Sequence, residues 1–186
     1  LAESAIPILI NEKKKGSDQT IYIWSAASST GEEIYSLAMT FEEHLSQSAD
    51  YRILGTDIDT DVLQKAASAA YKKTIVEEQV PVHLRMKYFT NSAKDEVSVC
   101  RQLRERTKFR QFNLIESQMP VEMQFDIIFL RNVLIYFTRT TIENVIRRLL
   151  RNLKPGGLIF IGHSESLNGL SLPIDQVSEA VYRHKR

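Results

Sequence analysis

The sequence has a single cysteine, no long apolar run and no cluster of metal-binding side chains. Cys100 is the only cysteine among 186 residues, so no disulfide can form within the chain, which fits a reducing compartment. The longest apolar runs fall far short of the ~20 residues that a membrane-spanning helix needs. His, Cys and Glu never occur at the spacing of metal ligands. These absences argue against a disulfide-stabilised scaffold, a membrane-spanning helix and a metal centre.

The sequence also has no large excess of positive or negative charge. The net charge is +1, so the chain as a whole has no electrostatic attraction to nucleic acid. Hydrophobic residues make up 43% and charged residues 25%, as is ordinary for a soluble globule. At this length a chain can bury most of its apolar surface. We therefore expect one domain over residues 1–186.

The most informative segment is Trp24–Met39, where a strand, a turn of small residues and a helix follow one another. The β-branched run Ile21–Ile23 enters the turn, and apolar residues recur at helical spacing after it. A turn of small residues lets a ligand approach the backbone closely, but the full Gly-x-Gly-x-x-Gly pattern of dinucleotide binding is missing. Glu32 and Glu33 would repel a pyrophosphate. They suit a cationic or hydroxyl-rich ligand such as S-adenosylmethionine.

The remaining elements alternate between strand and helix. The apolar run Phe125–Leu130 is typical of a buried parallel strand. Alternating residues between 88 and 112 predict a small antiparallel insertion. Pro155–Gly157 is expected to break the chain. The other expected strands span about 20–24, 51–56, 158–162 and 177–183, and the expected helices span 1–15, 33–46, 60–71 (capped by Thr60 or Asp61), 80–88 and 139–152.

Asp57 ends an expected strand about thirty residues after the first turn. In nucleotide-binding folds of this topology, a carboxylate at this place binds the ribose hydroxyls. A solvated loop acid or a helix cap is the alternative.

Further segments follow in a fixed order, and together with Trp24–Met39 they resemble the chemotaxis receptor glutamate methyltransferases, the CheR family, in their C-terminal S-adenosylmethionine-binding domain. The resemblance runs from about Leu1 to Tyr182. It implies a class I methyltransferase fold, a Rossmann-like three-layer α/β sandwich with a mostly parallel sheet and a small antiparallel insertion. The segments are Gly55–Asp59, Phe112–Leu114, Leu130–Phe137, Leu153–Gly157 and Ile161–Glu165.

The resemblance also implies the site. Tyr136 would line the acceptor site as the catalytic residue, although a core aromatic is the alternative. Leu114 has plain core packing as its alternative. For Glu33 the alternative is an acid that favours the helix dipole, and Glu32 could equally be the contact. The implied S-adenosylmethionine contacts are Ala26, Glu33, Asp57, Asn113, Leu114, Asn132 and Val133.

A basic run lies in the expected insertion, and Arg101, Arg104 and Arg106 belong to it. It is interpreted as a solvated hairpin face, or as a docking surface for an acidic protein or for nucleic acid. By resemblance, the partner would be the cytoplasmic domain of methyl-accepting chemotaxis receptors. Relatives that bind a receptor tether usually have glycines in this loop, and residues 90–99 contain none, which argues against tether binding.

The implied reaction is methyl transfer from S-adenosylmethionine to receptor glutamates in the cytoplasm. A glutamate is already ionised at neutral pH, so His163–Glu165 is not interpreted as a catalytic base. Family members usually begin with a helical domain that presents an arginine to the site, and nothing in residues 1–20 matches it. The alternatives are a class I methyltransferase for RNA or a small molecule, and a non-catalytic cofactor-binding module.

Overall fold

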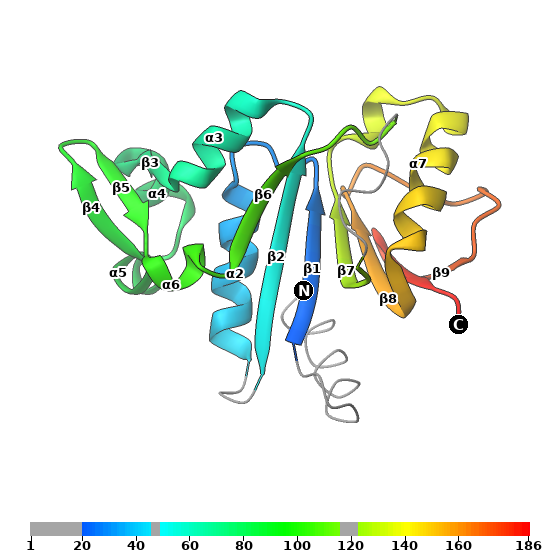
Figure 1. Cartoon of the computed structure of the whole chain (residues 1–186), viewed down its shortest axis with the longest axis horizontal. Helices are drawn as coiled ribbons and strands as arrows, with labels where there is room; N and C mark the ends of the chain where they lie inside the picture. Colours follow the sequence, from blue (N-terminus) through cyan, green and yellow to red (C-terminus); the bar gives the residue numbers. More distant parts are fainter. Residues whose placement is uncertain (1–19, 46–48, 116–122) are drawn as a thin grey trace.

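A seven-stranded sheet forms the body of the molecule (Figure 1). The computed structural model describes residues 20–45, 49–115 and 123–186, so the helix expected over residues 1–15 lies outside the described residues. In spatial order the strands are β6 (Thr107–Gln111), β2 (Asp50–Asp57), β1 (Thr20–Ala26), β7 (Phe125–Leu130), β8 (Leu153–Ile161), β10 (Val181–His184) and β9 (Ile174–Ser178). The first five are parallel to one another, β10 is antiparallel to β8, and β9 is antiparallel to β10.

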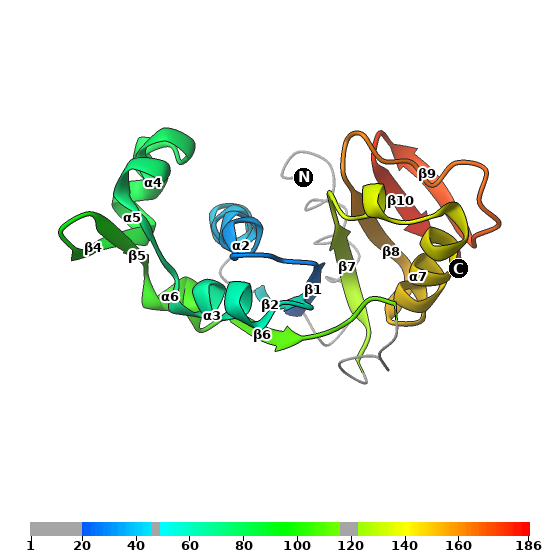
Figure 2. The same cartoon turned by 90° about the horizontal axis from the view of Figure 1, so that it is seen from above.

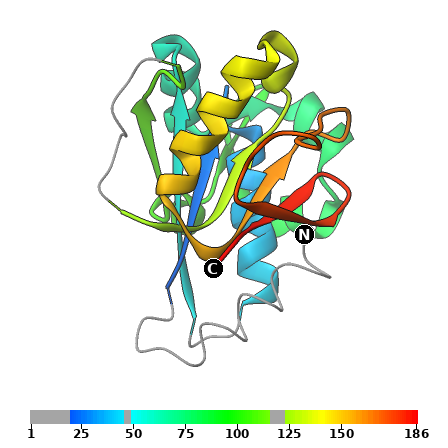
Figure 3. The same cartoon turned by 90° about the vertical axis from the view of Figure 1, so that its right-hand side faces the viewer.

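Two helices cover opposite faces of this sheet, as Figures 2 and 3 show. The helix α2 (Glu32–His44) packs Ile34 and Phe41 onto one face, and α7 (Arg139–Arg151) packs Ile146 onto the other. All six residues of β7 are buried, because this strand lies between the two layers. The prediction of a three-layer α/β fold with a mostly parallel sheet is therefore confirmed.

A second, three-stranded antiparallel sheet lies at one end of the molecule, beyond α3 (Thr60–Ser68) (Figure 1). We call it the small sheet. It is flanked by α4 and α5, and α6 leads from it back to β6. Its strands are β3 (Ala70–Lys72), β5 (Glu96–Val99) and β4 (Phe89–Ala93), and the helices are α4 (Lys73–Gln79), α5 (Val82–Tyr88) and α6 (Arg101–Arg104).

The small sheet differs in its bounds from the insertion expected over 88–112. It already begins at Ala70, and the alternating segment 107–111 is β6, which pairs in parallel with β2 in the main sheet. Alternation indicates that one side of a strand is buried, but it does not identify the neighbouring strand. The hairpin prediction for Lys108–Phe112 is therefore wrong.

Three further boundaries also differ. Asp59 caps α3, because its Oδ1 accepts hydrogen bonds from the backbone N–H groups of residues 61 and 62, and the left-handed Ala69 ends this helix before Tyr71. Residues 155–157 lie inside β8, where the pairing with β7 shifts register, and do not break it. The expected last strand is a hairpin, β9 and β10, with a left-handed residue at position 180. Among the described helices, none has both the length and the apolarity to cross a membrane.

Candidate functional site

The parallel strands end at one edge of the sheet, where the loops that follow them enclose a cavity of about 520 Å³. Open α/β sheets bind ligands at this edge, outside the carboxyl ends of their strands. Segments from four loops line the cavity: 27–33 after β1, 57–58 after β2, 112–115 after β6, and the segment after β7 as far as Phe137.

The turn after β1 is sharply bent. Ala27, Ser29 and Gly31 have positive φ angles of 66°, 48° and 92°. The turn is joined to the end of β2, because the N–H of Ser28 donates to the carbonyl of Thr56 over 2.8 Å. A side chain at position 31 would meet Ala66, whose Cβ lies 2.9 Å from where a Cβ would stand. Only glycine fits this place without strain.

Glu33 is the inner of the two carboxylates at the start of α2. Its Oε1 accepts a hydrogen bond from the Ser25 hydroxyl at 2.8 Å, and its Oε2 pairs with the Arg131 guanidinium at 3.0 Å. Glu32 is exposed and accepts from the Thr30 hydroxyl. Both glutamates line the cavity, but Glu33 is held by β1 and by the loop after β7, and it is less exposed than Glu32.

Asp57 stands where β2 leaves the sheet. Its Oδ2 accepts from the backbone N–H of Ser29 at 2.9 Å, and its Oδ1 accepts from that of Asp59 at 3.1 Å. Asp57 lines the cavity, and the cap of α3 is Asp59. The helix-cap alternative for Asp57 is therefore wrong.

Asn113 and Leu114 follow β6 and line the cavity wall opposite Arg131 and Asn132 along the sheet edge. The Asn113 Oδ1 accepts from the N–H of Ile115 at 2.9 Å, which folds the chain into a tight turn. Leu114 is half-buried against the core on the α7 side, so it takes part in both the core and the cavity.

The loop after β7 is held by Glu165. The carboxylate of Glu165 accepts hydrogen bonds from the backbone N–H groups of Asn132, Leu134 and Gly162, at 3.2, 2.8 and 2.6 Å. Asn132 is left-handed, with a φ of 59°. Its Oδ1 lies 2.7 Å from where a Cβ on Gly162 would stand, so residue 162 must be glycine for this approach. Glu165 thus shapes the loop that carries Asn132 and Val133.

Tyr136 lies in the short 3-10 helix η1 (Leu134–Tyr136) at the rim of the cavity. It is 78% exposed, so its interpretation as a core aromatic is wrong. His163 is exposed and is not among the residues that line the cavity.

One expected contact lies outside the cavity lining, and one residue of the lining was not expected. Ala26 is 1% exposed and lies outside the cavity lining, because β1 continues through it and its side chain packs into the core. The turn residues that line the cavity are Ala27, Ser28 and Ser29. Arg131 was not predicted, although its position directly before Asn132 at the end of a buried strand could have indicated it.

The family profile described as "CheR methyltransferase, SAM binding domain" matches residues 1–182. The chain belongs to this family. The chemotaxis protein methyltransferase 2 of Pseudomonas aeruginosa is 40% identical over 164 residues, which cover 86% of this chain and 58% of the relative. The chemotaxis protein methyltransferase of Salmonella typhimurium is 39% identical over 163 residues, which cover 86% of this chain and 57% of the relative. The chain thus spans less than two thirds of the length of these relatives.

Some solved structures resemble the chain distantly. One, described as PKMT2 from Rickettsia typhi, is 13% identical, and the match covers 87% of this chain and 25% of that chain with a TM-score of 0.49. A likeness at this level supports no conclusion about function.

The residues of the cavity fit S-adenosylmethionine, the cofactor that the CheR family profile names. Ser28 is 3% exposed, lines the cavity, and its hydroxyl has no hydrogen-bond partner among the described residues, so it offers a polar contact to a ligand. Glu33 suits an ammonium group and Asp57 suits vicinal hydroxyls, because carboxylates attract cations and accept hydrogen bonds. In the described part of the chain, no group of three or more His, Cys, Asp or Glu side chains could hold a metal ion.

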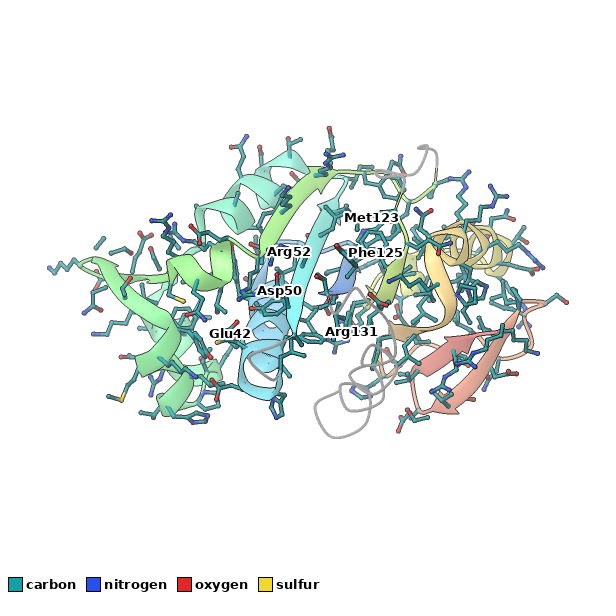
Figure 4. The ribbon with its side chains drawn as sticks, turned by 60° about the horizontal axis from the view of Figure 1, so that its bottom comes forward. Glu42, Asp50, Arg52, Met123, Phe125 and Arg131 are labelled. Carbon is teal, nitrogen blue, oxygen red and sulfur yellow. The ribbon has the colours of Figure 1, made fainter. Side chains whose placement is uncertain are left out.

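The basic residues of the CheR-family chain are not on a hairpin. Arg101 and Arg104 lie on α6, and Arg101 pairs with Glu105 at 2.5 Å. Arg106 contacts Asp50 and Glu42, which Figure 4 shows beside β2 and α2, away from Arg131. Arg106 therefore forms ion pairs within the fold, and docking through Arg101, Arg104 and Arg106 stays a prediction.

Proposed function

We propose that this chain binds S-adenosylmethionine and, in the whole protein, serves methyl transfer to glutamate side-chain carboxylates of methyl-accepting chemotaxis receptors. The observation that carries the proposal is a cavity with Glu33, Asp57 and the buried Ser28 hydroxyl on its wall and the exposed Tyr136 at its rim. The relatives named as chemotaxis protein methyltransferases support the same reaction class.

The inner wall of the cavity would hold the cofactor through charge and hydrogen bonding. Bound S-adenosylmethionine would supply an activated methyl group on a sulfonium. Glu33 is fixed between the Ser25 hydroxyl and the Arg131 guanidinium, so its carboxylate is oriented before any ligand arrives. Asp57 is fixed by two backbone N–H groups in the same way. Because these carboxylates are already ordered, little conformational entropy is lost on binding.

The rim of the cavity would receive the acceptor. A glutamate acceptor is ionised at neutral pH and needs no general base, so positioning is the main task of the protein. The Tyr136 hydroxyl can donate a hydrogen bond to an acceptor carboxylate and align it. The exposure of Tyr136 leaves this hydroxyl accessible to a large partner.

The test is calorimetry with S-adenosylhomocysteine on the wild type and on Asp57→Ala. We expect the wild type to bind and Asp57→Ala to bind less well by ~1–3 kcal/mol, the usual cost of losing a hydrogen-bonded carboxylate. Asp61→Ala is the matched control, because Asp61 is exposed on α3 and does not line the cavity. If the wild type binds no S-adenosylhomocysteine at millimolar concentration, the proposal fails.

A second measurement separates an enzyme from a binding module. Methyl transfer to receptor fragments is assayed with the full-length protein and radiolabelled cofactor. Methyl groups that base releases as methanol indicate carboxyl methyl esters, as on glutamate. Cofactor binding without transfer would instead favour a docking module, and transfer to RNA or a small molecule would favour another substrate class.

A further inference from the structure

A tyrosine of the small sheet reaches the turn that lines the cofactor cavity. Tyr71 lies in β3 and pairs with Val97 in β5. Its hydroxyl donates a hydrogen bond to the backbone carbonyl of Thr30 at 2.8 Å. The bond joins two elements that are 41 residues apart in the chain.

The turn Ala27–Gly31 needs support from several sides, because it contains three left-handed residues. Its first half is held from β2, where Ser28 donates to Thr56 and Ser29 donates to Asp57. Its second half faces α3 and β3: a Cβ at position 31 would lie 3.0 Å from the Tyr71 hydroxyl oxygen. The Tyr71 hydroxyl therefore closes the side of the turn that β2 does not reach.

The Tyr71 hydroxyl stays protonated and can donate throughout the working pH range. Burial raises the pKa of Tyr71 well above its usual range, and the nearby Tyr35 and Glu32 raise it further. The aromatic ring is fixed as well, because it meets the ring of Tyr35 edge-on at 6.1 Å between centroids. A rigid, protonated donor is suited to fixing a single backbone carbonyl.

We propose that Tyr71 is a positioning residue for the cofactor: its hydrogen bond to Thr30 keeps the Ala27–Gly31 turn in the shape that places Ser28, Ser29 and Glu32 along the cavity. The proposal rests on the proposed function, since it assumes that this cavity binds S-adenosylmethionine. It also makes the small sheet part of the cofactor site, although none of its strands lines the cavity.

The test removes only the hydroxyl. Tyr71→Phe should raise the Kd for S-adenosylhomocysteine about fivefold in calorimetry, which corresponds to about 1 kcal/mol. Tyr51→Phe is the matched control: Tyr51 is 1% exposed, its hydroxyl donates to the Ala38 carbonyl at 3.1 Å, and it does not line the cavity. This control should lower the Tm and leave the Kd unchanged.

Hydrogen exchange gives a readout that needs no ligand. The N–H of Gly31 donates to the Ser28 carbonyl inside the turn, at 3.1 Å. This amide should exchange faster in Tyr71→Phe than in the wild type, and at the wild-type rate in Tyr51→Phe.

The outcomes distinguish the two proposals. A wild type that does not bind S-adenosylhomocysteine overturns the proposed function. If the wild type binds and Tyr71→Phe has the same Kd and the same Gly31 exchange rate, the proposed function stands and the role of Tyr71 is overturned. If Tyr71→Phe and Tyr51→Phe lose affinity equally, the Tyr71 hydroxyl serves stability alone, and the inference is again overturned.

Discussion

The cavity edge of the seven-stranded sheet and the small sheet are built in different ways. At the cavity edge, the carboxylates of Asp57 and Glu165 accept hydrogen bonds from backbone N–H groups of neighbouring loops. The helix α5 beside the small sheet carries exposed apolar side chains that make no such bonds: Val82 is 59% exposed and Met86 is 82% exposed. In the first region, half-buried carboxylates fix the backbone of the loops, whereas these exposed apolar side chains of α5 cannot hydrogen-bond to a neighbouring backbone.

The largest effect is expected from Glu165→Ala. The substitution leaves the N–H groups of Asn132, Leu134 and Gly162 without their acceptor, so we expect a loss of about 2–3 kcal/mol in the free energy of unfolding. Urea denaturation measures it. The control is Glu96→Ala on the exposed face of β5, which should stay within about 0.5 kcal/mol of the wild type. If both variants lost the same free energy of unfolding, the cavity edge and the small sheet would not differ in this respect.

The next effect is expected from Gly31→Ala. Alanine would be strained at a φ of 92° and would also collide with Ala66, so we expect a loss of about 2 kcal/mol in unfolding free energy and weaker binding of S-adenosylhomocysteine. Gly156→Ala is the control, because Gly156 also has a positive φ, of 85°, but its nearest neighbouring atom lies at 3.5 Å. It should lose only about 1 kcal/mol, the cost of backbone strain alone. An equal loss would show that the packing of the turn against Ala66 is loose.

The sequence alone predicts some of these features and not others. Helical spacing identifies α7 because burial of one face imposes a periodicity, and a continuous apolar run identifies β7 because both of its faces are buried. The same patterns do not reveal which strand lies beside which, so Lys108–Phe112 could not be assigned to the edge of the main sheet. The sequence also marks polar residues at strand ends, such as Asp57 and Asn132. It does not show that Glu165 and Tyr71 hold the neighbouring backbone, since such contacts depend on the folded chain.

Tyr136→Phe should act on transfer alone. Tyr136 is exposed at the cavity rim, so removing its hydroxyl should leave stability and cofactor affinity unchanged. In the full-length protein, methyl transfer should fall at least about tenfold, the equivalent of about 1.4 kcal/mol in the barrier. Ile135→Ala is the control, because Ile135 is 60% exposed but does not line the cavity. A loss of cofactor affinity in Tyr136→Phe would show that Tyr136 binds the cofactor and not only the acceptor.

The smallest effect is expected where the small sheet joins α2. The Lys87 ammonium and the Tyr88 hydroxyl donate to the Glu43 carboxylate, and these bonds lower the pKa of Glu43. Since the folded pKa lies below the unfolded value of about 4.3, Glu43 stabilises the protein above that pH and loses this contribution as the pH falls through the folded pKa. Glu43→Gln should therefore be slightly less stable than the wild type at pH 7, and this difference should shrink as the pH is lowered to 3 in urea denaturation.

The control is Glu78→Gln, which changes an exposed glutamate of α4. It should follow the wild type at both pH values. A stability difference for Glu43→Gln that is the same at pH 7 and pH 3 would contradict the ionic link between the two regions.

The central place of β1 has a consequence for how the chain folds. β1 pairs with β2, which follows soon after it, but also with β7: the N–H of Tyr22 donates to the carboxylate of Asp126, 104 residues away. Closing so long a loop is entropically costly, so we expect β1, α2 and β2 to associate first and β7 to join them in a slower step. Asp57 and Asn132 lie on opposite sides of that junction. In a refolding experiment, the appearance of cofactor binding should therefore coincide with the last and slowest phase.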